Sequence, residues 1–170
     1  MNIVLVGLSG SGKTTIGKLL EKYLSGMKFV DTDEIIVKRE NKSINEIFAE
    51  SGEQKFREIE KAVTEEVSKD DNLIISTGGG VVLNKENILN LKKNGVVFYL
   101  KTSPEVIAER LKNDNTRPLL KVDDVKEKLF KMLETREKLY QTADFTVKTD
   151  ELSPNEVIEL ITKECKNERS

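Results

Sequence analysis

Residues 7–15, Gly-Leu-Ser-Gly-Ser-Gly-Lys-Thr-Thr, match the phosphate-binding loop G-x-x-x-x-G-K-[S/T]. The glycines let the backbone turn tightly, so that successive N–H groups converge on an anion at the positive end of the next helix. In such a loop Lys13 bridges the β- and γ-phosphates of a nucleotide, and the Thr14 hydroxyl binds Mg²⁺. The other residues expected to contact the nucleotide here are Gly10, Ser11, Gly12 and Thr15. The alternative is a glycine-rich turn without a ligand, but four specified residue types at this spacing rarely coincide by chance.

Two carboxylates, Asp31 and Asp33, stand at the end of an apolar run, residues 27–31, that we predict to be a strand. Side chains two residues apart in a strand share a face, and ligands of open α/β sheets bind beyond the carboxyl ends of the strands. If this strand neighbours the first strand, both carboxylates face the phosphates. One could then support the hydration shell of the metal while the other orients and deprotonates an acceptor hydroxyl. The alternative is that Thr32 or Asp33 only caps the helix predicted at 34–39.

The chain contains no histidine, so a proton acceptor is sought first among the carboxylates. A third apolar run, residues 73–77, is predicted to be a central strand and ends in Gly78, Gly79 and Gly80. Three glycines at such a strand end suit a close approach of the backbone to a ligand, although a flexible loop is the alternative. This strand lacks the terminal aspartate that often holds the metal in phosphate-loop proteins. Asp31 is therefore the better candidate for that task.

Several arginines could neutralise phosphate or carboxylate charge. Arg57 lies just off the apolar stripe of a predicted helix, and taken alone it would be a solvated helix arginine. Arg110 and Arg117 frame a polar loop at 112–121, and loops of this kind over a phosphate site act as lids that exclude water and place positive charge on the transferring group. Arg110 could instead simply end its helix. Arg136 lies on or near the edge of the apolar face of a later helix.

Strands and helices alternate along the chain, which predicts an α/β fold. Apolar, β-branched runs predict strands at 2–6, 27–31, 73–77, 95–100 and 145–147. Helical spacing predicts a first helix that begins at about Thr15, and further helices at 34–39, 44–50, 53–69, 85–93, 104–111, 125–140 and 153–163. We expect Gly26 to cap the first helix, with Tyr23 on its apolar face. Ser43 and Glu46 fit a capping box.

The composition indicates a single domain that spans residues 1–170. With 37% hydrophobic and 34% charged residues and a net charge of −2, the chain gives no electrostatic reason to expect nucleic acid or a membrane surface as a partner. Its one cysteine, Cys165, allows no disulfide within the chain and suits a reducing compartment. The apolar run before Gly7 is too short for a signal peptide or a membrane span. We therefore expect a cytoplasmic protein.

Further motifs follow the phosphate loop in a set order: Asp-Thr-Asp, Ser-Ile-x-x-Ile-Phe, Gly-Glu-x-x-Phe-Arg-x-x-Glu, Gly-Gly-Gly, Arg-Pro-Leu-Leu and a later helix arginine. From Gly7 to Arg136, this ordered set closely resembles the shikimate kinase family. The resemblance implies a P-loop kinase fold, with three α/β/α layers and a five-stranded parallel sheet. It also implies MgATP-dependent phosphorylation of the 3-hydroxyl of shikimate, in the cytoplasmic route through chorismate to the aromatic amino acids. ATP, shikimate and one Mg²⁺ ion are the implied partners, and we expect a monomer.

On the nucleotide side, the resemblance implies that Lys13 and Thr14 keep the roles that the loop motif predicts. Asp31 resembles the residue that supports the metal through water. Arg117 resembles a catalytic lid residue that reaches the phosphates, and the lid would span about 112–122. Two adenine contacts are implied, Arg110 and, with a looser match, Pro154.

On the acceptor side, Asp33 resembles the family's ligand of the acceptor hydroxyl and its catalytic base. Arg57 and Arg136 resemble the pair that binds the shikimate carboxylate, a task that a planar guanidinium performs better than a lysine. We expect a substrate-binding subregion at about 32–60. The other implied substrate contacts are the backbone at Gly78, Gly79 and Gly80 and an apolar wall of Phe48 and Phe56.

Two other functions are compatible with a phosphate loop. The chain could be another small-metabolite kinase of the same architecture, such as a gluconate or nucleotide kinase, although a nucleotide acceptor would not need Arg57 and Arg136 beside a glycine triplet. It could also be a non-enzymatic nucleotide switch. A GTP-binding switch needs an N-K-x-D motif, and residues 84–87, Asn-Lys-Glu-Asn, lack its aspartate.

Overall fold

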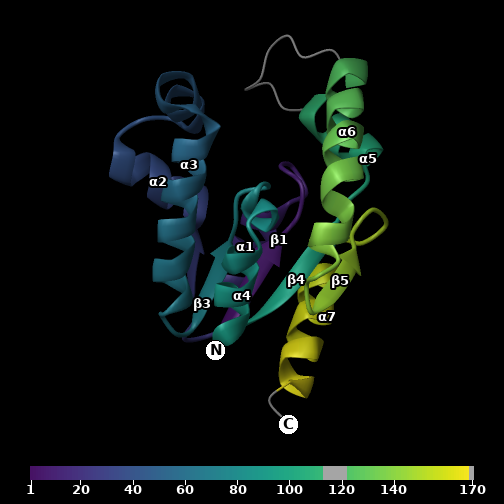
Figure 1. Ribbon diagram of the computed structural model, residues 1–170. Coiled ribbons are helices and arrows are strands. Elements are labelled where there is room, and N and C mark those ends of the chain that lie inside the picture. The colour runs from purple at the N-terminus through teal and green to yellow at the C-terminus, as the bar shows by residue number, and fades with distance from the viewer. Residues whose placement is uncertain (113–121, 169–170) are drawn as a thin grey trace.

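The computed structural model describes residues 1–112 and 122–168 of the chain. In this part, five parallel strands form one sheet in the order β2-β3-β1-β4-β5 (Figure 1). The strands are β1 (Asn2–Val6), β2 (Lys28–Asp31), β3 (Leu73–Ser76), β4 (Gly95–Lys101) and β5 (Phe145–Lys148). The phosphate loop therefore follows the central strand of the sheet.

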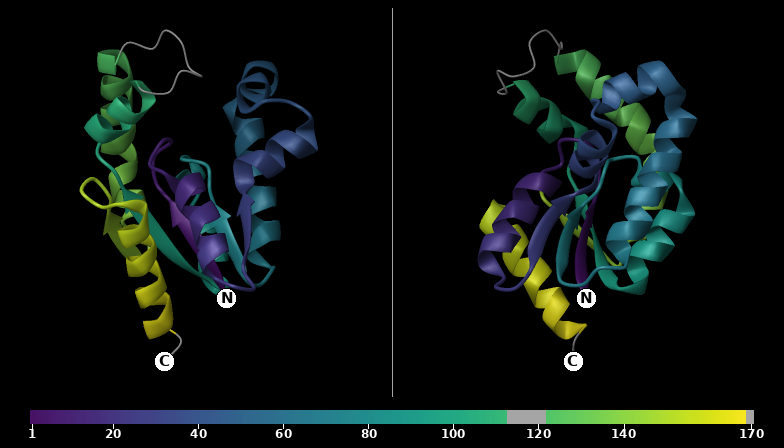
Figure 2. Two further views of the ribbon diagram at one scale, coloured as in Figure 1. Left: turned by 180° about the vertical axis from the view of Figure 1, so that it is seen from behind. Right: turned by 90° about the vertical axis from the view of Figure 1, so that its left-hand side faces the viewer.

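Helices cover both faces of this sheet (Figure 2). The described helices are α1 (Lys13–Tyr23), α2 (Thr32–Glu40), α3 (Ile44–Ser68), the 3₁₀ helix η1 (Val81–Leu83), α4 (Lys85–Lys93), α5 (Pro104–Lys112), α6 (Val122–Tyr140) and α7 (Pro154–Asn167). Successive side chains of β1 point to opposite faces. Val4 joins the core that includes residues of α3, α4 and α6, whereas Ile3 joins the core that includes residues of α1 and α7. The predicted three-layer α/β/α architecture with a five-stranded parallel sheet is confirmed.

No helix in the described part of the chain combines the length and the apolarity that crossing a lipid bilayer requires.

The position of β2 differs from the arrangement on which the two-carboxylate hypothesis depended. β2 pairs with β3 and not with β1, because β3 lies between them. The register sets Asp31 opposite Ser76, and Ser76 opposite Leu5, so the three strands end at the same level. A small residue at the end of β3 leaves room for the Asp31 side chain to reach past it. The two strands need not be neighbours for Asp31 to reach the phosphate loop.

Other local predictions are corrected by the structure. Asp33 does not share a strand face with Asp31, because it lies in the first turn of α2, where Asp31 is the N-cap. α1 ends at Tyr23 with Leu24 as its C-cap, so Gly26 is a turn residue with φ of 88° and does not cap the helix. Tyr23 is 63% exposed, which places it off the apolar face of α1. The separate helices predicted at 44–50 and 53–69 are confirmed, because α3 consists of two helical segments that meet at Gly52, whose φ of 79° and ψ of 169° are not helical.

Candidate active site

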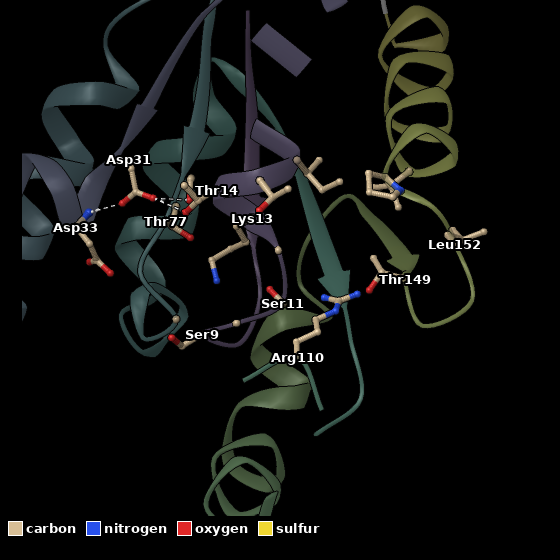
Figure 3. Close-up of a pocket in the computed structure, with 18 residues that line it drawn as sticks. Ser9, Ser11, Lys13, Thr14, Asp31, Asp33, Thr77, Arg110, Thr149 and Leu152 are labelled. Carbon is tan, nitrogen blue, oxygen red and sulfur yellow. Dashed lines mark hydrogen bonds between the residues drawn. The ribbon is translucent and has the colours of Figure 1, made fainter. Parts of the chain in front are cut away.

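A cavity of about 480 Å³ opens where β1, β2 and β3 end (Figure 3). This volume lies in the range of small-molecule binding sites. Most of the residues predicted to contact the nucleotide and the metal line the cavity, namely Gly10, Ser11, Gly12, Lys13, Thr14, Thr15, Asp31, Arg110 and Pro154. Asp33 and Gly79 line it as well. The predicted lid residue Arg117, with most of the lid segment, lies outside the described residues.

The phosphate loop holds Lys13 against its own backbone. Gly12 is the N-cap of α1 with φ of 95°, a left-handed conformation that favours glycine. The buried Nζ of Lys13 donates hydrogen bonds to the carbonyl oxygens of Gly7 at 2.9 Å and Leu8 at 2.8 Å. Burial lowers the pKa of Lys13 to about 8, although the charges of Asp33 and Asp31 oppose this shift. The loop therefore places a positioned cation at the floor of the cavity.

Asp31 is the N-cap of α2, whereas the sequence suggested Thr32 or Asp33 as the cap. Its Oδ1 accepts hydrogen bonds from the backbone N–H groups of Asp33 at 3.0 Å and Glu34 at 3.3 Å, which caps α2. Its Oδ2 accepts hydrogen bonds from the hydroxyls of Thr14 and Ser76, each at 2.9 Å. Figure 3 shows the contacts to Thr14 and Asp33. One carboxylate thus ties the start of α2 to the phosphate loop.

Thr14 and Asp31 are the oxygen donors that a divalent cation would meet beside the loop. Within residues 1–112 and 122–168, no group of three or more His, Cys, Asp or Glu side chains could hold a metal. This arrangement suits Mg²⁺, which keeps several waters and takes only one or two protein ligands besides phosphate oxygens. Both oxygens of Asp31 already accept hydrogen bonds, so the carboxylate is better placed to accept from metal-bound water than to bind a cation directly.

Asp33 carries a carboxylate with unused hydrogen-bonding capacity. Its Oδ1 is buried and has no hydrogen-bond partner among the described residues. A Cβ built on Gly78 would lie only 2.6 Å from this oxygen, so the carboxylate lies directly over that glycine. Burial raises the pKa of Asp33 and the charge of Asp31 adds to the effect, while Lys13 and Arg57 oppose it. The site therefore contains a buried acceptor oxygen between two cations.

The glycine triplet lies where three parts of the site meet. Gly78 makes room for the carboxylate of Asp33, and a side chain on Gly80 would collide with the guanidinium of Arg57. A Cβ on Gly79 would approach the backbone nitrogen of Ser9 in the phosphate loop to 3.1 Å. The close packing of these groups explains why small residues follow β3.

Arg57 is held on α3 by two acidic side chains. Its guanidinium pairs with Glu60 at 2.9 Å and with Glu53 at 3.3 Å, and it lies over the ring of Phe56 with its central carbon 5.1 Å from the ring centroid. Glu60 is only 1% exposed, and burial raises its pKa while Arg57 opposes the shift. The role of Glu60 as a buried partner was missed, although its position three residues after Arg57 on a helix could have indicated it.

Arg136 reaches the same segment from α6. Its guanidinium donates a hydrogen bond to the carbonyl oxygen of Gly79 at 3.3 Å, and the hydroxyl of Tyr140 donates to the same oxygen at 2.5 Å. Tyr140 was also missed as a site residue, although its position one helical turn after Arg136 could have indicated that the two side chains lie together. We refer to Arg57, Arg136, Gly79 and Gly80 as the glycine–arginine cluster. The cluster adjoins the cavity through Gly79, which lines it.

The rings of Phe48 and Phe56 pack against each other in a tilted arrangement beside Arg57, with centroids 4.7 Å apart and an interplanar angle of 36°. Residues eight positions apart would be separated by about 12 Å along a straight α-helix. The kink in α3 at Gly52, where φ is 79° and ψ is 169°, removes this separation. The fold therefore brings together the two rings that were expected to form an apolar wall.

The other side of the cavity is lined by residues from the region of α5 and α7. Arg110 approaches the phosphate loop, with one guanidinium nitrogen 3.7 Å from a Cβ built on Gly12. Thr149, Leu152 and Val157 line the cavity with Pro154 and were not predicted from the sequence. Figure 3 shows Arg110 and Leu152 on the opposite side of Lys13 from Asp33. The adenine contacts of Arg110 and Pro154 stay predictions.

Comparison with known proteins identifies the family. A model of the family described as shikimate kinase matches residues 9–166. The shikimate kinase of Caldicellulosiruptor saccharolyticus is 51% identical over 94% of this chain and 92% of its own length, and that of Thermodesulfovibrio yellowstonii is 48% identical over 96% and 94%. The structure of shikimate kinase from Acinetobacter baumannii in complex with shikimate superimposes with a TM-score of 0.87 at 35% identity, covering 98% of this chain and 93% of that chain. The chain belongs to the shikimate kinase family.

Proposed function

We propose that this protein transfers the γ-phosphoryl group of ATP to the 3-hydroxyl of shikimate, giving shikimate 3-phosphate and ADP for aromatic amino-acid biosynthesis. The observation that carries the proposal is the position of Asp33. Its buried Oδ1 has no hydrogen-bond partner in residues 1–112 and 122–168 and lies over Gly78. Lys13 of the phosphate loop and Arg57 of the glycine–arginine cluster are the cations that act on its pKa. An acceptor hydroxyl bound to Asp33 would therefore lie between a phosphate site and a carboxylate site.

The glycine–arginine cluster contains two guanidinium groups, and from these we infer that the acceptor carries a carboxylate. Arg57 and Arg136 each present planar N–H donors that match a carboxylate. In the described part of the chain, the backbone N–H groups of Gly79 and Gly80 have no hydrogen-bond partner, so they are free to donate to a substrate. The rings of Phe48 and Phe56 would cover the apolar side of the acid.

Phosphoryl transfer passes through a loose transition state, so alignment and charge neutralisation provide most of the catalysis. Lys13 would leave the carbonyls of its own loop for the phosphates, and Arg117 would add positive charge from the lid. Thr14 would bind Mg²⁺ directly and Asp31 through water. When bound, Mg²⁺ neutralises charge on the β- and γ-phosphates.

Asp33 would orient the acceptor hydroxyl and take its proton. The buried Oδ1 accepts no hydrogen bond from the part of the chain that the structure describes, so it can accept one from the hydroxyl without losing another. A raised pKa makes the carboxylate a better proton acceptor than an ordinary aspartate. The proton moves from the hydroxyl to Asp33 while the oxygen attacks the γ-phosphorus, and ADP leaves.

We place the enzyme in the cytoplasm as a monomer, a single domain of residues 1–170 with a substrate-binding subregion at about 32–60 and a lid at about 112–122. Arg110 and Pro154 would contact the adenine. A net charge of −2 supports the absence of nucleic acid and membrane among its partners.

The test is the release of ADP from MgATP with a panel of acceptors: shikimate, gluconate and nucleoside monophosphates. We expect release to depend on shikimate alone. Release with gluconate or a nucleotide, and none with shikimate, would replace the proposed acceptor. A gluconokinase from Sinorhizobium meliloti superimposes with a TM-score of 0.60 at only 16% identity, which shows a common fold and nothing about the acceptor. ATP binding without transfer to any acceptor would favour a nucleotide switch.

A further inference from the structure

Tyr140 is a buried tyrosine whose hydroxyl points at the glycine triplet. The side chain is 0% exposed, and its hydroxyl donates to the carbonyl oxygen of Gly79 at 2.5 Å. Burial raises the pKa of Tyr140, so the hydroxyl keeps its proton at neutral pH and remains a donor. A buried hydroxyl that donates to a backbone carbonyl at this distance points to a positional role rather than to hydrophobic packing alone.

Because of the geometry of the peptide bond, the contact of Tyr140 with the Gly79 carbonyl also affects the Gly80 N–H on the substrate side. The carbonyl of Gly79 and the N–H of Gly80 belong to the same planar, trans peptide unit, so they point in opposite directions. A hydrogen bond that fixes the carbonyl toward Tyr140 therefore fixes the N–H of Gly80 away from it. That N–H has no partner among the described residues.

Arg136 alone would not hold the Gly79 carbonyl in place once substrate binds. Its guanidinium also donates to the carbonyl of Gly79, but at 3.3 Å, and it must turn toward a carboxylate when an acid binds. The Tyr140 hydroxyl is uncharged, so the carboxylate of the substrate does not attract it as it attracts a guanidinium. It can therefore keep the carbonyl satisfied and the peptide in place while Arg136 changes partners.

Residues of the sheet hold the ring of Tyr140 in place. It stacks on Tyr99 of β4 with centroids 4.9 Å apart and an interplanar angle of 17°. The hydroxyl of Tyr99 donates to Glu137 at 2.8 Å, and Lys101 donates to the other oxygen of Glu137 at 2.5 Å. These contacts hold α6 against β4. They therefore restrict the position of the Tyr140 ring and keep its hydroxyl directed at the Gly79 carbonyl.

We propose that Tyr140 is a positioning residue for the acid substrate: through the Gly79 carbonyl, its hydroxyl sets the direction of the Gly80 N–H that binds shikimate. This inference rests on the proposed function. It assigns the hydroxyl no contact with the substrate and no part in proton transfer.

The test compares Tyr140→Phe with Tyr99→Phe, in each case measuring kcat, the KM values for shikimate and ATP, the shikimate Kd by calorimetry, and Tm. Both substitutions remove a buried hydroxyl from the same stacked pair of rings, but only Tyr140 contacts the glycine triplet. We expect Tyr140→Phe to raise the shikimate KM and Kd roughly five- to tenfold, as the loss of one hydrogen bond does, with the ATP KM unchanged. Tyr99→Phe should lower Tm and leave the shikimate KM within about twofold.

The outcomes separate the inference from the function on which it rests. A wild-type protein that does not phosphorylate shikimate overturns the proposed function. A wild-type protein that does so, with an unchanged shikimate KM in Tyr140→Phe or equal changes in both variants, overturns the role of Tyr140. Loss of ATP binding in Tyr140→Phe would assign the hydroxyl to folding and also overturn it.

Discussion

The phosphate loop and the glycine–arginine cluster are built in different ways. The loop is local: Lys13 is held by the carbonyls of Gly7 and Leu8, within one turn between β1 and α1. The cluster joins Arg57 of α3 and Arg136 of α6 at a backbone segment after β3, and acidic side chains or a backbone carbonyl hold its arginines. One half of the site is made mainly of backbone, and the other mainly of side chains from distant parts of the chain.

This difference predicts how each half should respond to change. A backbone site tolerates changes in distant helices, because its geometry is local. A side-chain site depends on the packing of several helices and on the charges that hold its cations. Asp33 lies between the two and is influenced by a cation from each.

The largest effect is expected at Asp33, where the two halves meet. Asp33→Asn should lower kcat by about ten- to ten-thousandfold, the range expected for removal of a general base, with ATP affinity nearly unchanged. Steady-state kinetics and ATP titration would measure both quantities. An unchanged kcat would remove Asp33 from the chemistry.

The same variant supplies its own control for folding. A raised pKa means that the folded protein holds the Asp33 proton more tightly than the unfolded chain does. The corresponding stability is present below the ordinary pKa of an aspartate in the unfolded chain and is lost as pH rises through the raised pKa of Asp33 in the folded protein. At pH 7 Asp33→Asn should therefore have a Tm at or above that of the wild type, with the difference shrinking toward acid pH. A lower Tm at neutral pH would show that the carboxylate stabilises the fold.

A smaller and more selective effect is expected in the glycine–arginine cluster. Arg57→Ala or Arg136→Ala should weaken shikimate binding by about 2 kcal/mol or more, because a bound carboxylate would lose its charged partner. ATP affinity should change little. Titration calorimetry with each ligand separates the two effects.

Arg39→Ala is a matched control for these arginine variants. Arg39 is 41% exposed and pairs with Glu66 at 2.9 Å on the surface of the protein, where an ion pair contributes little. Shikimate affinity should be unaffected. Equal losses in all three variants would show that net charge, and not the cluster, governs binding of the acid.

The smallest effect is a pH dependence that distinguishes the two halves. With the pKa of Lys13 at about 8, the free enzyme loses the ammonium that phosphates require as pH rises through that value. The ATP Kd should therefore rise by about tenfold per pH unit above pH 8. Guanidinium groups are not deprotonated in proteins, so the shikimate Kd should stay constant from pH 7 to about 9. A constant ATP Kd would contradict the lowered pKa.

The sequence predicted the fold well because each element carries its own signal. Helix α4 was predicted at its observed bounds, and the capping box at Ser43 is present. The order of strands was less accessible, because the sequence does not reveal that β3 inserts between β2 and β1. Gly26 and Tyr23 were placed wrongly because a glycine near a helix end and an aromatic residue at helical spacing do not always cap or pack.

The candidate site also contains residues that the sequence alone could predict and residues that it could not. The residues of the phosphate loop could be predicted from one motif, because their geometry depends on a few neighbouring residues. Arg57 and Arg136 could be assigned only through the family resemblance, since nothing in their own helices distinguishes them from solvated arginines. Tyr140 was missed because its contact forms only when α6 packs beside the glycine triplet. Glu60 pairs with Arg57 within α3, so its spacing of three residues was available in the sequence, but its burial was not.

The kink at Gly52 has a consequence for how sequence variation in this protein should be interpreted. The residue is exposed, and a Cβ there would meet no atom of the described residues within 4 Å, so by these contacts alone the position looks tolerant of any side chain. Its φ of 79° is nevertheless one that other residues rarely adopt, and straightening the helix would separate the two phenylalanine rings. A replacement at this surface position would therefore damage recognition of the acid while both aromatic residues remained intact.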